Sequence, residues 1–232
     1  MLTHRDLANL QLRLYNGPPT DREDYKWAVP PTEIAGVSLA VAVIGDICCV
    51  AFEGTHDLRD VIRDLECPMI RAHNIGKVHP GAYTGIEQVW RELKSTLWPK
   101  WCVGGHSLGA MHSTALCAEA EAFDLRDPVA QVLWGCPAPG DGTFARWQGS
   151  RTTNYRNIGK YPDGRNFVDP FTRLPRSFPL ECYRQVCDFT DLCGVPKPDD
   201  PWNAHVLGLE IIDFSPHRMD YYAAETPETS IL

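Results

Sequence analysis

The chain has 232 residues, of which 44% are hydrophobic and 22% are charged, and its formal net charge is −8 at pH 7. This composition excludes a disordered chain, and the longest apolar run, Leu39–Ile44, is far too short to cross a bilayer. The acidic balance and the lack of a Lys/Arg block argue against a nucleic-acid partner and leave at most a transient contact with a lipid surface.

The first predicted element is a helix near the N-terminus. Thr3 can cap this helix, and Leu7, Leu10 and Leu14 share one of its faces, so we expect it to pack on the core. The same stretch lacks the basic start, apolar run and small-residue cleavage site of a secretory signal, so a cytoplasmic protein is expected. The length suits a single domain over residues 1–232.

Two β-rich runs come next, Val37–Ile44 and Ile47–Phe52, with a Gly-Asp pair between them. Their β-branched content and the intervening turn residues predict a hairpin or two closely linked strands. Aliphatic residues at helical spacing, with charged residues between them, then predict a helix over His56–Leu65. A second amphipathic helix is predicted over Gly85–Leu97.

The second half of the chain alternates between apolar strands and helices. Such alternation predicts an α/β fold with a mostly parallel central sheet flanked by helices. The stretch Asp163–Pro201 is rich in Pro, Asp and Arg, and we expect long loops there, over the end of the sheet where α/β proteins place their sites. Strands are predicted at Trp101–Val103, Val129–Trp134, Asn154–Ile158 and Leu207–Phe214, and helices at Leu108–Phe123 and from about His217 to Ala224.

The chain contains nine cysteines, an odd number. The late group, Cys182, Cys187 and Cys193, contains no Cys-x-x-Cys pair and has no His at ligand spacing, so no metal site is predicted. This pattern fits free thiols in a reducing compartment better than a framework of disulfide bonds. Four others lie in apolar runs and are predicted to be buried free thiols: Cys48, Cys49, Cys102 and Cys117.

The sharpest motif is the pentapeptide Gly-His-Ser-Leu-Gly at residues 105–109, between a predicted strand and a predicted helix. This is the pattern of a nucleophile elbow, in which a serine sits on a strained strand-to-helix turn with its hydroxyl exposed for attack. The residues two positions before and after the serine must be very small so that strand and helix can approach, and Gly105 and Gly109 meet that need. Ser107 is therefore the predicted nucleophile of a hydrolase.

Five ordered sequence blocks resemble the class 3 lipases, the family of the fungal triacylglycerol lipases. The resemblance runs from about Val37 to the C-terminus and implies an α/β-hydrolase fold and a carboxylic-ester hydrolase that uses a Ser-Asp-His triad and an acyl-enzyme intermediate. The blocks are Ala51–Thr55, Val78–Tyr83, Gly104–Ala110, Trp134–Gly140 and Asp169–Pro175.

The resemblance assigns roles to residues on both sides of the elbow. Ser107 matches the family's nucleophile, and Thr55 matches the residue that shares the oxyanion hole with the amide after the serine, which here is the N–H of Leu108. The Leu108 N–H would lie at a helix N-terminus, where a developing negative charge is stabilised. Thr55 could also cap the helix predicted after it.

The acid and the base follow the serine in this fold. Asp169 matches the family's acid, although the stretch between the Asn154–Ile158 strand and Asp169 is longer than the family usually has. Asp163, in a Tyr-Pro-Asp-Gly turn sequence, is its rival.

Only His205 and His217 follow Asp169 in the sequence. His217 is favoured as the base because it comes after the late strand and opens the last predicted helix, as the family's histidine does. His205 fits a loop or structural role better. His79 and His106 match family histidines that are not the base, and we expect them to be structural and paired near the elbow.

Two departures from the family bear on the substrate. Glu53 replaces the family's usual Arg, and His56–Leu65, where fungal lipases carry a lid helix, offers only aliphatic side chains among alternating charges. The first departure reverses a charge next to the predicted oxyanion segment. The second favours an esterase, on lipid or short- to medium-chain acyl esters, with little activation at an interface. No cofactor or metal is implied. The alternatives are another acyl transfer at the same site, as in a thioesterase or transacylase, and a non-catalytic lipase-like interaction protein.

Overall fold

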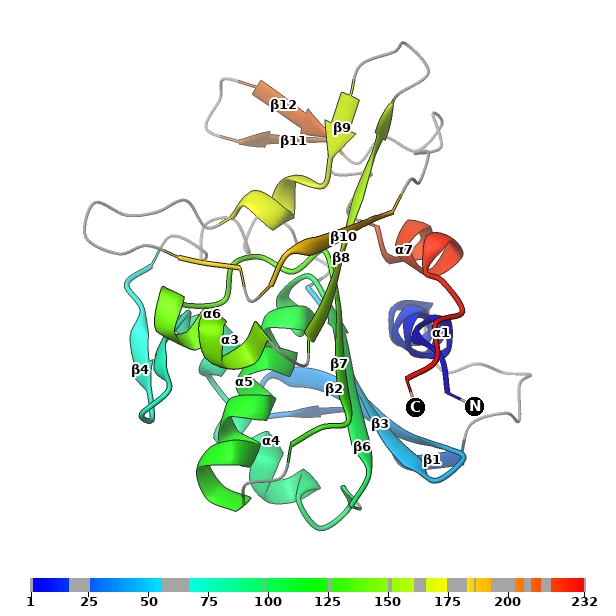
Figure 1. The fold of residues 1–232 in the computed structure, drawn as a ribbon, viewed down its shortest axis with the longest axis vertical. Helices are drawn as coiled ribbons and strands as arrows, with labels where there is room; N and C mark the ends of the chain where they lie inside the picture. Colours follow the sequence, from blue (N-terminus) through cyan, green and yellow to red (C-terminus); the bar gives the residue numbers. More distant parts are fainter. Residues whose placement is uncertain are drawn as a thin grey trace.

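The computed structural model describes residues 2–16, 26–55, 67–97, 99–124, 127–149, 152–160, 166–174, 183–185, 187–192, 203–206, 210–213 and 218–231. One large sheet runs through this part of the chain (Figure 1). Its strands are β1 (Lys26–Ile34), β2 (Val37–Ile44), β3 (Ile47–Phe52), β6 (Trp101–His106), β7 (Ala130–Trp134), β8 (Thr152–Lys160), β9 (Asn166–Val168) and β10 (Phe189–Leu192).

The sheet has the strand order β1-β2-β3-β6-β7-β8-β10, and β9 pairs with β8. The hairpin formed by β2 and β3 is antiparallel and matches the predicted runs residue for residue, with Leu39 opposite Phe52 and Ile44 opposite Ile47. From β3 through β6, β7 and β8 to β10, each neighbouring pair is parallel. The predicted α/β fold with a mostly parallel central sheet is therefore confirmed.

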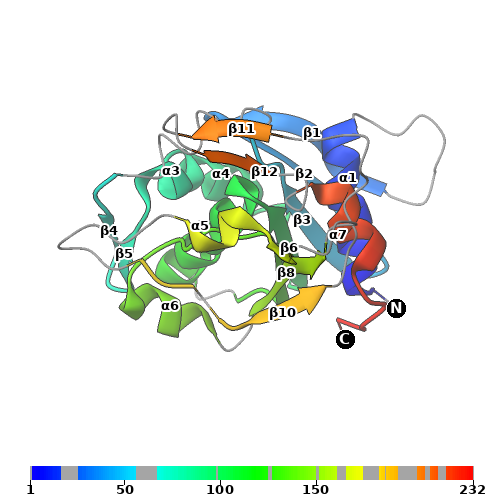
Figure 2. The same ribbon diagram turned by 90° about the horizontal axis from the view of Figure 1, so that it is seen from above.

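Helices cover both faces of this sheet (Figures 1 and 2). On one face lie α1 (His4–Asn16) and α7 (Met219–Glu225), and the other face carries α3, α4, α5 and α6. The last four are α3 (Pro80–Tyr83), α4 (Ile86–Leu93), α5 (Leu108–Asp124) and α6 (Gly142–Gln148). No helix of the described residues is long and apolar enough to span a bilayer.

The two helices that cover one face come from opposite ends of the chain and are tied together. The His4 N–H donates to the Thr229 carbonyl at 2.9 Å, and the Ile231 N–H donates to the Leu2 carbonyl at 2.9 Å. The predicted cap is present as well, because the Asp6 N–H donates to Thr3 Oγ1 at 3.2 Å.

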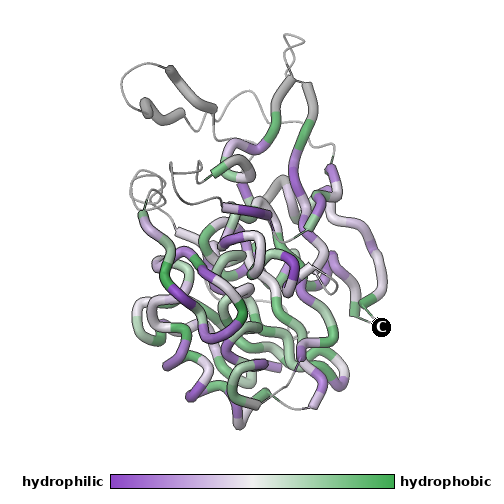
Figure 3. The backbone as a smooth tube through the Cα atoms, turned by 60° about the vertical axis from the view of Figure 1, so that its left-hand side comes forward, coloured by the Kyte–Doolittle hydropathy of each residue, from purple (hydrophilic) through white to green (hydrophobic). Residues whose placement is uncertain are grey.

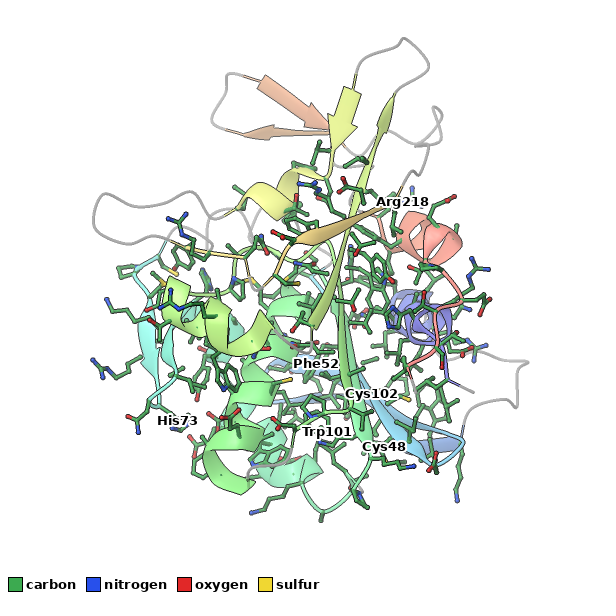
Figure 4. All side chains as sticks on the ribbon, in the orientation of Figure 1. Cys48, Phe52, His73, Trp101, Cys102 and Arg218 are labelled. Atoms are coloured by element: carbon green, nitrogen blue, oxygen red, sulfur yellow. The ribbon has the colours of Figure 1, made fainter. Side chains whose placement is uncertain are left out.

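The core forms two layers because successive strand residues face opposite sides. Cys49, Cys102 and Trp134 pack toward the side of α1 and α7, whereas Val50 and Val103 pack toward α4 and α5. Figure 3 shows many hydrophobic segments in the lower body of the molecule, and Figure 4 shows the first residue of β6, Trp101, at this end. The four cysteines predicted to be buried free thiols are buried and form no disulfide.

Several elements differ from the prediction. Lys26–Ile34 forms β1, a largely exposed edge strand that contains Pro30 and Pro31. The stretch expected to be loops holds β9 and β10, and β10 extends the main sheet through β8. Within the predicted late strand, the described residues form β12 (Glu210–Asp213), which pairs with β11 (Asn203–Val206) in a two-stranded sheet separate from the main one.

Smaller elements complete the described structure. A short hairpin, β4 (Ile70–Ala72) and β5 (Gly76–Val78), precedes α3. A single-turn 3-10 helix, η2 (Pro170–Arg173), follows β9. The predicted helix at His56–Leu65 lies outside the described residues.

Candidate active site

Ser107 lies between the end of β6 and the start of α5, as the elbow motif predicts. Its φ of 58° is in the left-handed region, which costs an L-residue about 1–2 kcal/mol. The turn is fixed by the Ser107 N–H, which donates to the Trp134 carbonyl at 3.0 Å, and by the Ser107 carbonyl, which accepts from the Ala110 N–H at 3.0 Å. Such strain persists only where the surrounding structure imposes it, and it is common at reactive residues.

The two glycines of the motif are required by space. A Cβ on Gly105 would lie 2.1 Å from the Gly109 carbonyl oxygen, and a Cβ on Gly109 would lie 2.3 Å from the Phe52 carbonyl oxygen. Both neighbours are backbone atoms that cannot rotate away. The contacts also bring the end of β3 directly against the elbow.

The elbow motif predicts an exposed hydroxyl, but the hydroxyl of Ser107 is buried and finds no hydrogen-bond partner among the described residues. A buried hydroxyl without a partner costs about 1–3 kcal/mol, so its retention indicates a use beyond stability.

The segment predicted to complete the oxyanion hole leaves β3 beside the nucleophile. A Cβ on Gly54 would lie 3.0 Å from Ser107 Cβ, so Gly54 passes directly alongside the serine. Thr55 follows it and is half-buried. Leu108 is the first residue of α5, where the leading N–H groups have no partner within the helix. The structure thus brings Ser107 next to the Gly54–Thr55 segment and the α5 N-terminus.

Tyr15 of α1 is a residue that the sequence analysis did not identify. Its hydroxyl accepts from the Gly54 N–H at 2.8 Å and lies 2.8 Å from Nδ1 of His106, the residue before the nucleophile. Burial raises the pKa of Tyr15, which keeps it protonated. Gln11, one turn earlier on the same helix face, donates to the Phe52 carbonyl. Two polar residues spaced four apart beside an apolar stripe were the available signal.

Asp169 is fully buried and held by three elements. Its N–H donates to the Asn157 carbonyl of β8 at 2.9 Å, and its Oδ1 accepts from the Phe171 N–H at 2.9 Å, so it caps η2. Its other carboxylate oxygen accepts from the hydroxyl of Tyr222 on α7. Burial and the adjacent Asp169 charge raise the pKa of Tyr222, so Tyr222 remains a hydrogen-bond donor.

The long spacing before Asp169 has a structural cause. β8 continues to Lys160, and β9 pairs back on it with Lys160 opposite Asn166 and Ile158 opposite Val168. This hairpin returns the chain to Asn157 before Asp169 begins η2. Asp163 lies outside the described residues, between the two ends of this hairpin.

The four histidines considered from the sequence fall into three groups. His217 lies outside the described residues, and His205 lies in β11 without a described side chain. His106 packs beside the elbow between Tyr15 and Tyr222, with its ring 5.6 Å from each of their rings. His79 Nδ1 accepts from the Gly81 N–H at 3.1 Å, and its Nε2 lies 3.1 Å from Cys67 Sγ, so these two contacts tie it to α3 and to Cys67.

Among the described residues, no cluster of three or more His, Cys, Asp or Glu side chains is arranged to hold a metal ion. The described surface has a cavity of about 220 Å³ near the C-terminal half of α5, lined in part by Glu121, Gln131 and Trp147. Since Ser107 precedes the first residue of α5, this cavity belongs to the other end of that helix.

Comparison with known proteins supports the fold and the resemblance to lipases. The family model for lipase (class 3) matches residues 49–163, which include the elbow and three of the other resembling blocks. The Asp169 block and both late histidines lie beyond the match. No curated protein sequence matches the chain.

Solved lipase structures share the fold at low sequence identity. The Lip2 lipase from Yarrowia lipolytica superimposes with a TM-score of 0.59 at 18% identity, over 83% of this chain and 77% of that one. A triacylglycerol lipase from Penicillium expansum gives 0.56 at 16% identity, over 82% and 78% of the two chains. The Rhizomucor miehei lipase in its propeptide complex gives 0.56 at 17% identity, over 97% and 76%. The predicted resemblance to the class 3 lipases is therefore confirmed, and the chain has the α/β-hydrolase fold of these lipases.

Proposed function

We propose that this protein is a serine carboxylic-ester hydrolase with Ser107 as its nucleophile. The observation that carries the proposal is the state of Ser107 itself, a strained and buried serine whose hydroxyl has no partner among the described residues. Energetically costly features of this kind are retained where chemistry requires them. The neighbouring Gly54–Thr55 segment and the α5 N-terminus supply the donors that such chemistry needs.

The proposed reaction is a two-step acyl transfer. Ser107 Oγ attacks the ester carbonyl while the base takes its proton, the alcohol leaves with a proton returned by the base, and water then hydrolyses the acyl-enzyme. The backbone N–H groups of Thr55 and Leu108 stabilise the oxyanion of each tetrahedral intermediate. Asp169 orients the base and stabilises its cationic form. No cofactor takes part.

We propose His217 as the base, and the contacts of α7 support this choice. Arg218, the next residue, is the N-cap of α7, and Figure 4 shows it at the upper end of that helix. Tyr222 of the same helix donates a hydrogen bond to Asp169, so α7 is anchored directly on the proposed acid. His205 lies instead in the small β11–β12 sheet, which does not pair with the main sheet.

The proposed substrates are soluble esters of short or medium acyl length. The acidic chain is repelled by anionic lipid, and the segment 56–65 carries no aromatic side chain that could anchor in a lipid interface. We therefore expect the rate on a short-chain triglyceride to rise smoothly across its solubility limit. A sharp jump in rate above that limit would indicate instead a lid-gated lipase that acts at interfaces.

The test is active-site labelling combined with ester turnover. Wild type should react with a fluorophosphonate probe at Ser107 and hydrolyse nitrophenyl esters of rising acyl length, whereas Ser107→Ala should lose the label and at least about 1,000-fold in turnover. Ser95→Ala, which changes an exposed serine after α4, should retain both. If wild type neither reacts with the probe nor hydrolyses any ester, the protein is a non-catalytic relative.

A paired substitution separates the two candidate bases. His217→Ala should resemble Ser107→Ala in severity, and combining the two should add little because they act as a unit. His205→Ala should remain active. The reverse pattern would assign the base to His205 and leave the serine chemistry unchanged.

A further inference from the structure

A second cysteine–histidine contact lies outside the proposed catalytic residues. Cys67 Sγ lies 3.1 Å from Nε2 of His79, and the Tyr183 hydroxyl donates to the Cys67 carbonyl at 2.7 Å. The Tyr183 and His79 rings are 6.0 Å apart. We propose that Cys67 is a nucleophilic thiol supported by His79, and that the pair is a covalent modification site for soft carbon electrophiles such as α,β-unsaturated carbonyl compounds.

The hydrogen bonds of His79 define which of its ring nitrogens carries the proton. Nδ1 accepts from the Gly81 N–H, because His79 is the N-cap of α3, so this nitrogen must keep its lone pair. In the neutral ring the proton is therefore on Nε2, the nitrogen that faces Cys67. The imidazole thus presents an N–H donor to the sulfur, and a donor favours the thiolate over the thiol.

The backbone around His79 holds this donor in place. The His79 N–H donates to the Pro139 carbonyl at 2.8 Å, and Val78 forms a β-bridge with Gly140. His79 itself is only 2% exposed, so its ring has little freedom to turn away. Cys67 is the more exposed residue of the pair, because it is only partly buried.

The other described thiols lack this combination of exposure and a donor. Cys187 is the other partly exposed one, and burial together with the nearby Asp188 charge raises its pKa to about 11. The hydrogen bond with Cys49 raises the pKa of Cys102, and burial raises the pKa of Cys136. Both belong to a group of five buried thiols: Cys48, Cys49, Cys102, Cys117 and Cys136. A raised pKa leaves almost no thiolate at neutral pH.

The chemistry of the proposed modification balances without an oxidant or a cofactor. The thiol loses its proton to solvent, and the sulfur forms a bond to the β-carbon of the unsaturated carbonyl compound. The carbon–carbon π electrons move to the carbonyl as an enolate, which then takes a proton from solvent at the α-carbon. With iodoacetamide the sulfur bonds to the methylene carbon and iodide leaves.

The experiment follows iodoacetamide alkylation of each cysteine in the intact, reduced protein at pH 7 by peptide mass spectrometry. Cys67 should be alkylated at least about tenfold faster than Cys187, since the thiolate fraction controls the rate more strongly than intrinsic nucleophilicity does. The same measurement in Ser107→Ala should give an unchanged rate at Cys67, which separates this proposal from the proposed ester hydrolysis. A lower rate at Cys67 than at Cys187 overturns the proposal.

Two matched variants test the role of His79. His79→Asn keeps a side-chain acceptor for the Gly81 N–H, so α3 stays capped, but removes the donor to Cys67, and the rate at Cys67 should fall about threefold. Tyr183→Phe removes only the bond to the Cys67 carbonyl and should leave the rate within about twofold of wild type.

A pH series on wild type provides a measurement that needs no variant. The alkylation rate at Cys67 should reach half its maximum below the ordinary thiol pKa of about 8.5, and His79→Asn should move that midpoint upward. A midpoint at or above 8.5 in wild type, or equal midpoints in the two proteins, would show that His79 does not support the thiol.

Discussion

Two turns in this molecule depend on glycine for different reasons. At the β2–β3 hairpin, Gly45 has a φ of +63°, and a Cβ added there would meet no atom within 4 Å. At the elbow, Gly105 and Gly109 are surrounded by backbone atoms at 2.1 and 2.3 Å from the added Cβ, whereas the left-handed conformation there belongs to Ser107. The hairpin uses glycine for a dihedral angle, and the elbow uses it for space.

The comparison indicates where each turn can tolerate change. Replacing a glycine that is needed only for its positive φ costs about 1 kcal/mol, and Asn can adopt the same φ. Replacing a glycine whose Cβ would clash with fixed backbone must displace a strand or a helix. The elbow also concentrates unfavourable features that the hairpin turn does not need, namely a non-glycine residue at positive φ and a buried hydroxyl without a described partner. The folded structure around the elbow must offset both.

The largest effect is expected for Gly105→Ala. Its methyl would overlap the Gly109 carbonyl oxygen, and we expect the free energy of unfolding to fall by about 3 kcal/mol or more. Urea denaturation measures this change, with Gly45→Ala as the matched glycine control. Equal losses in the two variants would mean that the elbow can relax and that space is not what selects glycine there.

A comparable effect is expected for His112 at acid pH. This residue lies in the α5 turn that follows the elbow; its Nε2–H donates to the Gly81 carbonyl at 3.2 Å, and its Nδ1 has no described partner. Burial lowers the pKa of His112 to about 4, below its ordinary 6.5, so protonation favours the unfolded chain. Its contribution is complete above pH 6.5 and is lost as the pH falls toward 4, by about 3 kcal/mol in all.

The measurement for His112 compares the free energy of unfolding of wild type and His112→Gln between pH 7 and pH 4.5. The glutamine amide retains a donor for Gly81 but does not titrate, so the difference between the two proteins isolates this histidine from all the other titrating groups. Parallel pH profiles would contradict the assignment.

The next effect tests how the elbow is braced by α1. Tyr15→Phe leaves the Gly54 N–H without its partner and should lower the free energy of unfolding by about 1–2 kcal/mol. Because Gly54 precedes Thr55, ester turnover should also fall by about tenfold. Tyr155→Phe is the matched control: Tyr155 lies 2.7 Å from His4 Nδ1 in a similar buried pair of a tyrosine and a histidine. It should lose similar stability and keep wild-type turnover, and an equal loss of turnover in both variants would contradict a specific role for Tyr15.

The smallest effect is expected at the hairpin turn. Gly45→Ala should cost about 1 kcal/mol, and Gly45→Asn should stay within about 0.5 kcal/mol of wild type, because Asn tolerates positive φ. Thermal or urea unfolding of the two variants measures the difference. If Asn were as costly as Ala, an interaction other than the dihedral angle would be selecting glycine at this turn.

The parts of the fold that were predictable are those whose signals are local. The β2–β3 hairpin carries its turn and its alternation within one short stretch, and the elbow carries its geometry within five residues. β1 was missed because Pro30 and Pro31 argue against a strand, yet an edge strand tolerates them, and register shifts between Trp27 and Thr32 absorb them. β10 has four residues and pairs with a distant strand, so no local pattern marks it.

The residues of the candidate site also differ in whether their signals are local in the sequence. The elbow geometry at Ser107 was predictable because it depends on an immediate strand–turn–helix context. Asp169 was ranked above Asp163 through resemblance and because Asp163 lies in a turn sequence, since the contacts that anchor Asp169, with Asn157 and Tyr222, are distant in sequence. Tyr15 was missed for the same reason, since its partners Gly54 and His106 become neighbours only after the sheet has formed.

The pairing of α1 with α7 has a consequence for the order of events during folding. α1 contributes Tyr15 beside His106 and α7 contributes Tyr222 on Asp169, so these two helices, distant in sequence, meet next to the proposed catalytic residues. Contacts of such long sequence separation close the largest loops and tend to form slowly. During synthesis the elbow is therefore translated and able to fold well before α7 exists. We therefore expect the contact between Tyr222 and Asp169 to form late in folding, when the sheet from β3 to β8 is already in place.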